Sequence, residues 1–162
     1  MITITSGNLF KEKVDAIVNA VNCVGVAGKG IALQFKKLYP YNFQLYKQAC
    51  NNHKIKIGKM FITKNLHLHQ PKYIINFPTK NHWREKSKLE YINKGLDDLV
   101  DKIQKLNISS IAIPALGCGC GGLEWKQVKN IIKKKLENLN MSIFLFAPIQ
   151  LKTKKYIQNQ MK

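Results

Sequence analysis

The chain has 162 residues, 45% of them hydrophobic, which is enough for one domain with a sizeable buried core. It has no apolar run near the ~20 residues that a membrane-spanning helix needs, and its first residues lack the basic and apolar regions of a signal peptide, so a membrane or secreted protein is not expected. The net charge of +18, from 27 basic and 9 acidic residues, favours a polyanionic partner such as nucleic acid, although an AT-rich genome also encodes a lysine-rich composition.

In the first half of the chain, apolar periodicity predicts alternating strands and helices. The expected strands are 1–5, 16–22, 59–64 and 73–77, the last of them ending before Pro78, and the expected helices run from Ile31 to Pro40 and from Tyr41 to just before Asn51. In the second of these helices, Tyr41, Leu45 and Ala49 form the expected apolar face.

The second half continues the alternation. Ser87 and Glu90 have the spacing of a capping box, in which the serine side chain caps the helix that follows. The expected elements are a helix from there to Leu106, a strand at 110–114, a helix at 125–139 and a strand at 141–146. The alternation predicts one α/β domain over residues 1–150 with a largely parallel inner sheet. The basic tail at 151–162 is expected to be a short helix, a linker or disordered.

The four cysteines, Cys23, Cys50, Cys118 and Cys120, do not form a recognisable disulfide framework. We therefore expect a reduced, cytoplasmic protein. Cys118 and Cys120 have C-x-C spacing without a second pair of ligands, so they are expected to be small loop-filling residues, with no metal site. The sequence predicts no bound cofactor.

Two glycine-rich loops each join a predicted strand to a predicted helix. The first has Gly25, Gly28 and Gly30 and fits neither the Walker A pattern nor the Rossmann pattern. By itself it indicates either a phosphate-binding loop at a helix N-terminus or a tight turn. The second spans 114–123. Because open α/β sheets bind ligands at the carboxyl ends of their strands, the two loops are expected to hold a diphosphate from both sides.

Four segments together resemble the macrodomain family, which binds ADP-ribose: Gly7-Asn8-Leu9, VNAVN at 18–22, GVAGKG at 25–30 and PALGCGCGGLEW at 114–125. The resemblance implies a three-layer α/β/α sandwich with a central mixed, mostly parallel sheet. It also implies an ADP-ribose-binding set of Asn8, Leu9, Asn22, Gly28, Lys29, Gly30, Ile31, Thr79, Leu116, Gly117, Cys118, Gly119, Cys120, Gly121 and Phe146.

Three of these residues have specific implied roles, each with a structural alternative or a departure from the family. Asn22 either holds the distal ribose hydroxyls or makes an Asx turn before the glycine loop. Asn8 stands where many macrodomains have an aspartate that accepts from the adenine amino group, and an asparagine carbonyl can also accept. Phe146 either stacks on adenine or packs in the core.

The segment NFPTKxHWR at 76–84 resembles the DarG-type branch of the family, the DNA ADP-ribosyl glycohydrolases. This resemblance implies that Lys80 is the catalytic residue for cleavage at C1″ of the distal ribose. Lys80 acts either as a neutral amine nucleophile or as a charged group that protonates or polarises the leaving base. The related animal glycohydrolase, which acts on proteins, has an aspartate where this chain has Gly121, so a lysine–aspartate pair is not available.

His82, Trp83 and Arg84 are the predicted nucleic-acid contacts, because tryptophan stacks on bases and Arg84 is the chain's single arginine. The alternative is that Trp83 packs beneath the following helix. The resemblance implies a hydrolase that removes ADP-ribose from thymidine in single-stranded DNA, as a monomeric antitoxin to a DarT-type DNA ADP-ribosyltransferase. Hydrolysis of ADP-ribosylated protein, non-catalytic ADP-ribose binding and plain nucleic-acid binding are the competing functions.

Overall fold

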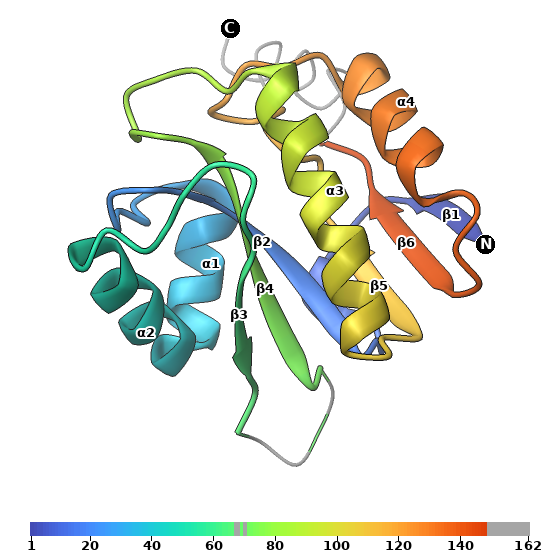
Figure 1. The fold of residues 1–162 in the computed structure, drawn as a ribbon, viewed down its shortest axis with the longest axis horizontal. Helices are drawn as coiled ribbons and strands as arrows, with labels where there is room; N and C mark the ends of the chain where they lie inside the picture. The colour runs from blue at the N-terminus through green and yellow to red at the C-terminus, as the bar shows by residue number, and fades with distance from the viewer. Residues whose placement is uncertain (67–68, 70, 149–162) are drawn as a thin grey trace, which may run out of the picture.

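The computed structural model describes residues 1–66, 69 and 71–148, and Figure 1 shows its course. In chain order the elements are β1 (Ile2–Thr5), the 3-10 helix η1 (Leu9–Lys11), β2 (Ala16–Asn22), α1 (Gly30–Leu38), α2 (Pro40–Asn51), β3 (Phe61–Lys64), β4 (Tyr73–Lys80), α3 (Leu89–Lys105), β5 (Ser110–Ile113), α4 (Trp125–Leu136) and β6 (Ser142–Phe146). None of the helices in this described part is long and apolar enough to cross a bilayer. The tail expected at 151–162 lies outside the described residues.

Six strands form one sheet in the order β1-β6-β5-β2-β4-β3. Every neighbouring pair is parallel except β3 and β4, so the predicted mixed, mostly parallel sheet is confirmed. The carboxyl ends of β2, β4 and β5 therefore meet at one edge of the sheet, where the two glycine loops begin.

The prediction that β4 ends before Pro78 is wrong, because the strand continues to Lys80. Pro78 pairs in register with Val21 of β2, while β3 on the other side of β4 pairs only as far as Asn76. Proline lacks a backbone donor, and it is tolerated here because one side of the strand has no neighbour to bond. The extension carries Lys80 to the edge of the sheet.

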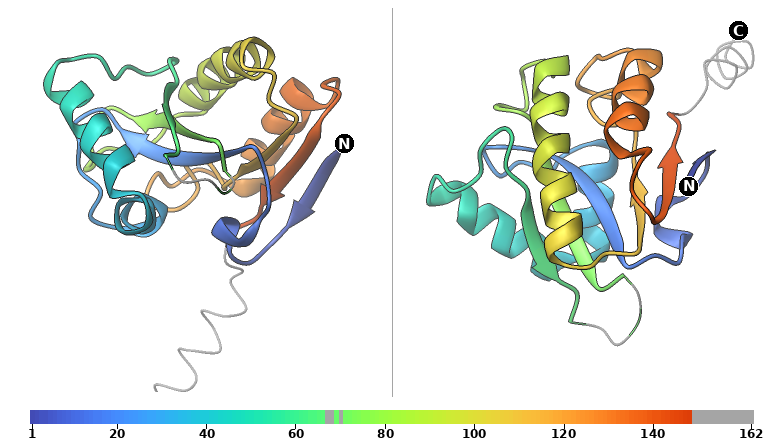
Figure 2. Two further views of the ribbon diagram at one scale, coloured as in Figure 1. Left: turned by 90° about the horizontal axis from the view of Figure 1, so that it is seen from below. Right: turned by 45° about the vertical axis from the view of Figure 1, so that its right-hand side comes forward.

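Helices cover both faces of the sheet, as the three-layer prediction requires. Figure 2 shows α1 and α2 on one side of the sheet and α3 and α4 on the other. Neighbouring residues of the buried strands face opposite sides of the sheet and pack in two different cores. Val18 and Ile75 face α3 and α4, whereas Ile17 and Ile74 pack with Phe35 of α1. The expected α/β/α sandwich is confirmed.

Two local predictions about the helices are wrong. Ser87 does not cap α3, which has Lys88 at its N-cap and no side-chain cap bond. Instead Ser87 is buried and its backbone N–H donates to the Gly121 carbonyl at 3.0 Å, because it packs beneath the second glycine loop. In α2 the expected face is wrong only in part: Ala49 is buried as expected, but Tyr41 is exposed, and the buried face also contains Asn42 and Tyr46.

Gly95 allows α3 to lie directly on the ring of Phe77 in β4. A methyl group added at Gly95 would overlap that fully buried ring. We expect Gly95→Ala to lower the free energy of unfolding by about 1–3 kcal/mol through overpacking, whereas the same change in an open helix stabilises by roughly 0.5–1 kcal/mol. Urea unfolding measures the difference. Asn93→Ala, at an exposed position of α3, is the control, and an unchanged or raised free energy for Gly95→Ala would contradict the close packing.

Candidate functional site

A cavity of about 720 Å³ opens at the carboxyl ends of β2, β4 and β5. Both glycine loops and the end of β4 form its walls. The predicted site residues that line it are Asn22, Gly28, Lys29, Gly30, Ile31, Thr79, Lys80, Trp83, Arg84, Gly117, Gly119, Cys120 and Gly121. The fold thus brings together most of the residues that the sequence proposed from separate segments.

Asn22 organises the first glycine loop. Its side-chain Oδ1 accepts from the backbone N–H groups of Val24, Gly25 and Val26 at 3.1–3.3 Å, and its Nδ2 donates to the Val26 carbonyl at 2.8 Å. The Tyr46 hydroxyl donates to the Asn22 carbonyl at 2.7 Å. These bonds form the Asx-type turn that was the alternative to a ligand role. Asn22 also lines the cavity, so its contact with ribose stays a prediction.

The first loop leads directly into α1. Gly30 is the first residue of the helix and has φ +59°, and Lys29 precedes it without a side-chain cap bond. Uncapped N–H groups and the positive end of the helix dipole therefore face the cavity. This arrangement suits a phosphate group.

The second loop is held from below by Ser87. The Leu123 N–H donates to the Gly117 carbonyl at 2.9 Å and closes the loop, while Gly121 accepts from the backbone of Ser87. A Cβ at Gly121 would overlap Ser87 Oγ and lie 2.5 Å from the Gly117 carbonyl oxygen. Position 121, where the resemblance implies an aspartate in the animal enzyme, therefore has no room here for any side chain.

Lys80 lies at the end of β4, half-buried in the cavity wall, with its Nζ donating to the Trp83 carbonyl at 3.1 Å. The Trp83 side chain is 44% exposed, which rules out the packed position that was its alternative. The Arg84 guanidinium lies 4.6 Å from the Trp83 ring centroid, and His82 stacks on the same ring. One short turn thus combines the proposed catalytic amine, an exposed aromatic surface and a cation.

Several predicted residues do not line the cavity. Asn8 uses its Oδ1 to cap η1 by accepting from Phe10, and Phe146 is buried with Leu9 in the core beneath α1. Leu116 and Cys118 lie beneath the second loop, packed on the core that faces α3 and α4. His82 contacts Trp83 and not the cavity. The role of His82 toward nucleic acid and the roles of the other residues toward ADP-ribose remain predictions.

Several apolar residues of the cavity wall are not among the predicted site residues. Within or beside the proposed motifs, the cavity is also lined by Ala20, Val21, Val26, Ala27, Ala32, Pro114 and Ala115. All of them except Ala32 lie inside the motif segments at 18–22, 25–30 and 114–125, so including every apolar residue of those segments would have found all but Ala32.

Two thiols beside the site, Cys23 and Cys118, are not poised as nucleophiles. Burial raises the pKa of Cys118 to about 11, and burial with the nearby Cys50 and Glu85 raises the pKa of Cys23 to about 11. Both are protonated at neutral pH. The described residues contain no group of three or more His, Cys, Asp or Glu side chains that could hold a metal ion.

The comparisons with known proteins agree with this geometry. The family model described as Macro domain matches residues 18–132. A protein named DNA ADP-ribosyl glycohydrolase from Thermus aquaticus is 48% identical over 151 residues, which is 93% of this chain and 42% of that protein. The chain therefore spans less than half the length of this relative.

Two solved structures are also similar. The macrodomain of Mycobacterium tuberculosis DarG superposes with a TM-score of 0.90 at 49% identity, covering 92% of this chain and 99% of that one. Thermosipho africanus DarTG in complex with ADP-ribose superposes with a TM-score of 0.86 at 31% identity, covering 91% of this chain and 42% of that one. The curated name of the Thermosipho protein describes a fusion of a DNA ADP-ribosyl transferase with a DNA ADP-ribosyl glycohydrolase.

Proposed function

This chain belongs to the macro domain family, and from that membership we propose that it is a glycohydrolase that removes ADP-ribose from thymidine in single-stranded DNA. The observation that carries the proposal is the position of Lys80. The cavity combines two glycine loops suited to a diphosphate with a lysine amine in its wall. If the loops hold the diphosphate of ADP-ribose, the distal ribose of the same ligand extends toward that amine.

Lys80 supplies the chemistry in this proposal. Cleavage of the glycosidic bond at C1″ passes through a transition state with positive charge on the ribose and negative charge on the departing base. A lysine at this point either attacks C1″ as a neutral amine or donates a proton to the base. The hydrogen bond to the Trp83 carbonyl orients the amine.

The choice of DNA over protein rests on the turn that follows Lys80. The exposed Trp83 ring offers a stacking surface for a base, and Arg84 places a positive charge beside it. The net charge of +18 favours a polyanionic substrate. The relative from Thermus aquaticus, named as a DNA ADP-ribosyl glycohydrolase, supports the same choice.

We further propose that the protein acts in the cytoplasm as a monomeric antitoxin to a DarT-type DNA ADP-ribosyltransferase. The fusion of the two activities in the Thermosipho relative supports a functional pairing of this kind. The cysteines of the described residues are free thiols, which suits a reducing compartment.

One experiment separates the candidate functions. The protein is incubated with a single-stranded oligonucleotide that carries ADP-ribosyl-thymidine and, separately, with a protein that carries ADP-ribosyl-glutamate. We expect release of the unmodified oligonucleotide, measured by mass spectrometry. Release from the protein substrate alone would assign a protein hydrolase. Release from neither, with ADP-ribose bound in calorimetry, would leave a non-catalytic binding module.

Trp83→Ala tests the stacking surface. Loss of stacking on one base costs about 1–3 kcal/mol, so we expect KM for the oligonucleotide to rise roughly 5- to 150-fold. Trp83→Phe, which keeps an aromatic face, is expected to recover part of this loss. Tyr41→Ala is the matched control, because Tyr41 is a similarly exposed aromatic residue outside the cavity. Equal KM values for Trp83→Ala and Tyr41→Ala would show that the ring does not contact the substrate.

A further inference from the structure

The acidic residues of this chain are unevenly distributed. Residues 16–84 contain no Asp or Glu, but they contain ten of the lysines and the single arginine. The nine acids are Glu12, Asp15, Glu85, Glu90, Asp97, Asp98, Asp101, Glu124 and Glu137. A codon bias toward lysine does not by itself produce a run of this length without an acid.

The fold converts this sequence asymmetry into a difference between two sides of the molecule. The acid-free segment forms β2, α1, α2, β3 and β4. In Figure 1 α1, α2 and β3 lie to the left of α3 and α4. On the α3 side several lysines are paired with acids: Lys94 with Glu90 at 2.9 Å, Lys105 with Asp101 at 3.0 Å and Lys135 with Asp97 at 2.6 Å. Residues 85–148 contain ten lysines and seven acids, whereas residues 16–84 contain eleven basic residues and no acid. Positive charge is therefore largely balanced by acids in one segment and not balanced in the other.

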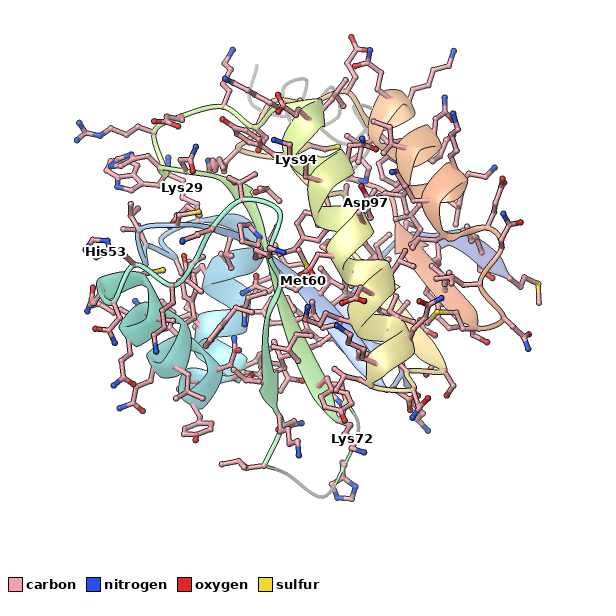
Figure 3. The ribbon with its side chains drawn as sticks, in the orientation of Figure 1. Lys29, His53, Met60, Lys72, Lys94 and Asp97 are labelled. Carbon is pink, nitrogen blue, oxygen red and sulfur yellow. The ribbon has the colours of Figure 1, made fainter. Side chains whose placement is uncertain are left out.

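Three lysines of the acid-free side lie beside the first glycine loop, and we call Lys47, Lys54 and Lys56 the lysine edge. Lys47 packs against the loop, with its Cγ 3.4 Å from where a Cβ of Gly25 would lie. Lys54 and Lys56 are exposed on either side of Ile55, which is buried in the small core beneath the loop. Figure 3 labels His53, the residue before Lys54, just beyond the end of α2, and Lys29, which lines the cavity.

The lysine edge is also connected to the turn that carries Trp83. Cys23 packs on the same small core as Ile55, and its backbone N–H donates to the Asn81 carbonyl at 3.2 Å. This bond ties the start of the first loop to the segment between Lys80 and Trp83. An acid also approaches this surface, since the charge of Glu85 acts on the Cys23 thiol. The rim of the cavity on this side is thus continuous with the lysine edge.

We propose that the lysine edge binds the phosphates of a single strand of nucleic acid that runs out of the cavity. Exposed apolar side chains accompany the charges, with Val24 at 43%, Val26 at 41% and Trp83 at 44% exposure around the cavity rim. Grooves that bind single strands usually combine flexible cationic side chains, which contact the phosphates, with apolar surfaces, which contact the bases. This inference rests on the proposed function and adds the path of the substrate strand, which leaves the cavity toward α2 and away from α3.

The test compares long and short substrates. The variant Lys47→Gln/Lys54→Gln/Lys56→Gln is assayed on ADP-ribosyl-thymidine strands of about 25 and about five nucleotides. We expect KM for the long strand to rise on the order of tenfold, with kcat unchanged and with little change for the short strand. Salt dependence is measured with an unmodified fluorescein-labelled oligothymidylate. For the variant, the slope of log affinity against log salt should be less steep by about 2, because each of the three lost phosphate contacts contributes about 0.7.

The matched control removes the same charge elsewhere. Lys72→Gln/Lys133→Gln/Lys134→Gln changes three exposed lysines, at the start of β4 and in the last turn of α4, away from the cavity wall. Equal effects of the two variants would mean that only overall charge matters and would overturn the lysine edge. Equal KM values of the wild type and the first variant on the long strand would also overturn it. If the wild type hydrolyses neither strand, it is the proposed function that fails.

Discussion

Lys80→Ala is expected to lower the rate of ADP-ribose release from DNA by about 10²–10⁴-fold, the contribution typical of a positioned acid, base or nucleophile. Lys80 is half-buried in the cavity wall, where its Nζ is held by the Trp83 carbonyl at 3.1 Å. Because the proposed diphosphate contacts come from the glycine loops, affinity for free ADP-ribose should fall by only a few-fold. Single-turnover kinetics on the oligonucleotide and calorimetry with ADP-ribose measure the two effects separately.

Lys29→Ala is the matched control for the loss of a lysine. Lys29 also lines the cavity, at the start of α1, and its removal takes away the same charge. We expect this variant to bind ADP-ribose more weakly but to keep its rate at saturating substrate. If Lys80→Ala behaves in the same way, Lys80 only pairs with phosphate and the protein is not a lysine-dependent hydrolase.

Lys80→Arg separates the two chemical roles. Arginine keeps the positive charge but is not deprotonated at neutral pH, so it can polarise a leaving group and cannot attack C1″ as an amine. Activity retained within about tenfold favours the electrostatic role. Activity as low as that of Lys80→Ala means that Lys80 acts as a nucleophile or as a proton donor. Reduction with cyanoborohydride during turnover separates these two roles, because only a nucleophilic amine becomes joined covalently to ADP-ribose.

The layers and most elements of the fold could be predicted because they follow from the apolar pattern. The alternation along β2, with Ile17 on one face of the sheet and Val18 on the other, is visible in the sequence. The end of β4 could not be predicted, because Pro78 is allowed in the strand only by the absence of a neighbour beyond Asn76. That absence is a property of the assembled sheet and not of the local sequence.

The candidate site, like the fold, could be predicted from the sequence only in part. The sequence located Lys80 and both glycine loops, because each belongs to a continuous motif. It assigned Ser87 to the cap of α3, because a serine three residues before a glutamate fits that pattern. In the structure Ser87 contacts Gly121, 34 residues further along the chain, and a contact at such separation leaves no local signal. The support beneath the second loop therefore emerges only from the fold.

Gly121→Ala is expected to weaken ADP-ribose binding by about 100-fold or more. The added methyl group would overlap Ser87 Oγ and approach the Gly117 carbonyl oxygen to 2.5 Å. Neither neighbour can move freely, since Ser87 is bonded to Gly121 and Gly117 is bonded to Leu123 through the backbone. The loop must open, and backbone donors displaced by about 1 Å no longer fit a diphosphate. Calorimetry with ADP-ribose measures the loss.

Two further variants show whether the overlap is the cause. An added methyl group at Gly119, in the same loop, meets no atom within 4 Å, so Gly119→Ala should leave the loop and the melting temperature unchanged. Ser87 Oγ is buried and has no hydrogen-bond partner among the described residues, so Ser87→Ala alone should be close to neutral. In the Gly121→Ala background, however, Ser87→Ala removes the closest overlapping atom and should restore part of the affinity, a coupling that a double-mutant cycle measures. Additive effects of the two changes would mean that Ser87 does not position the second loop.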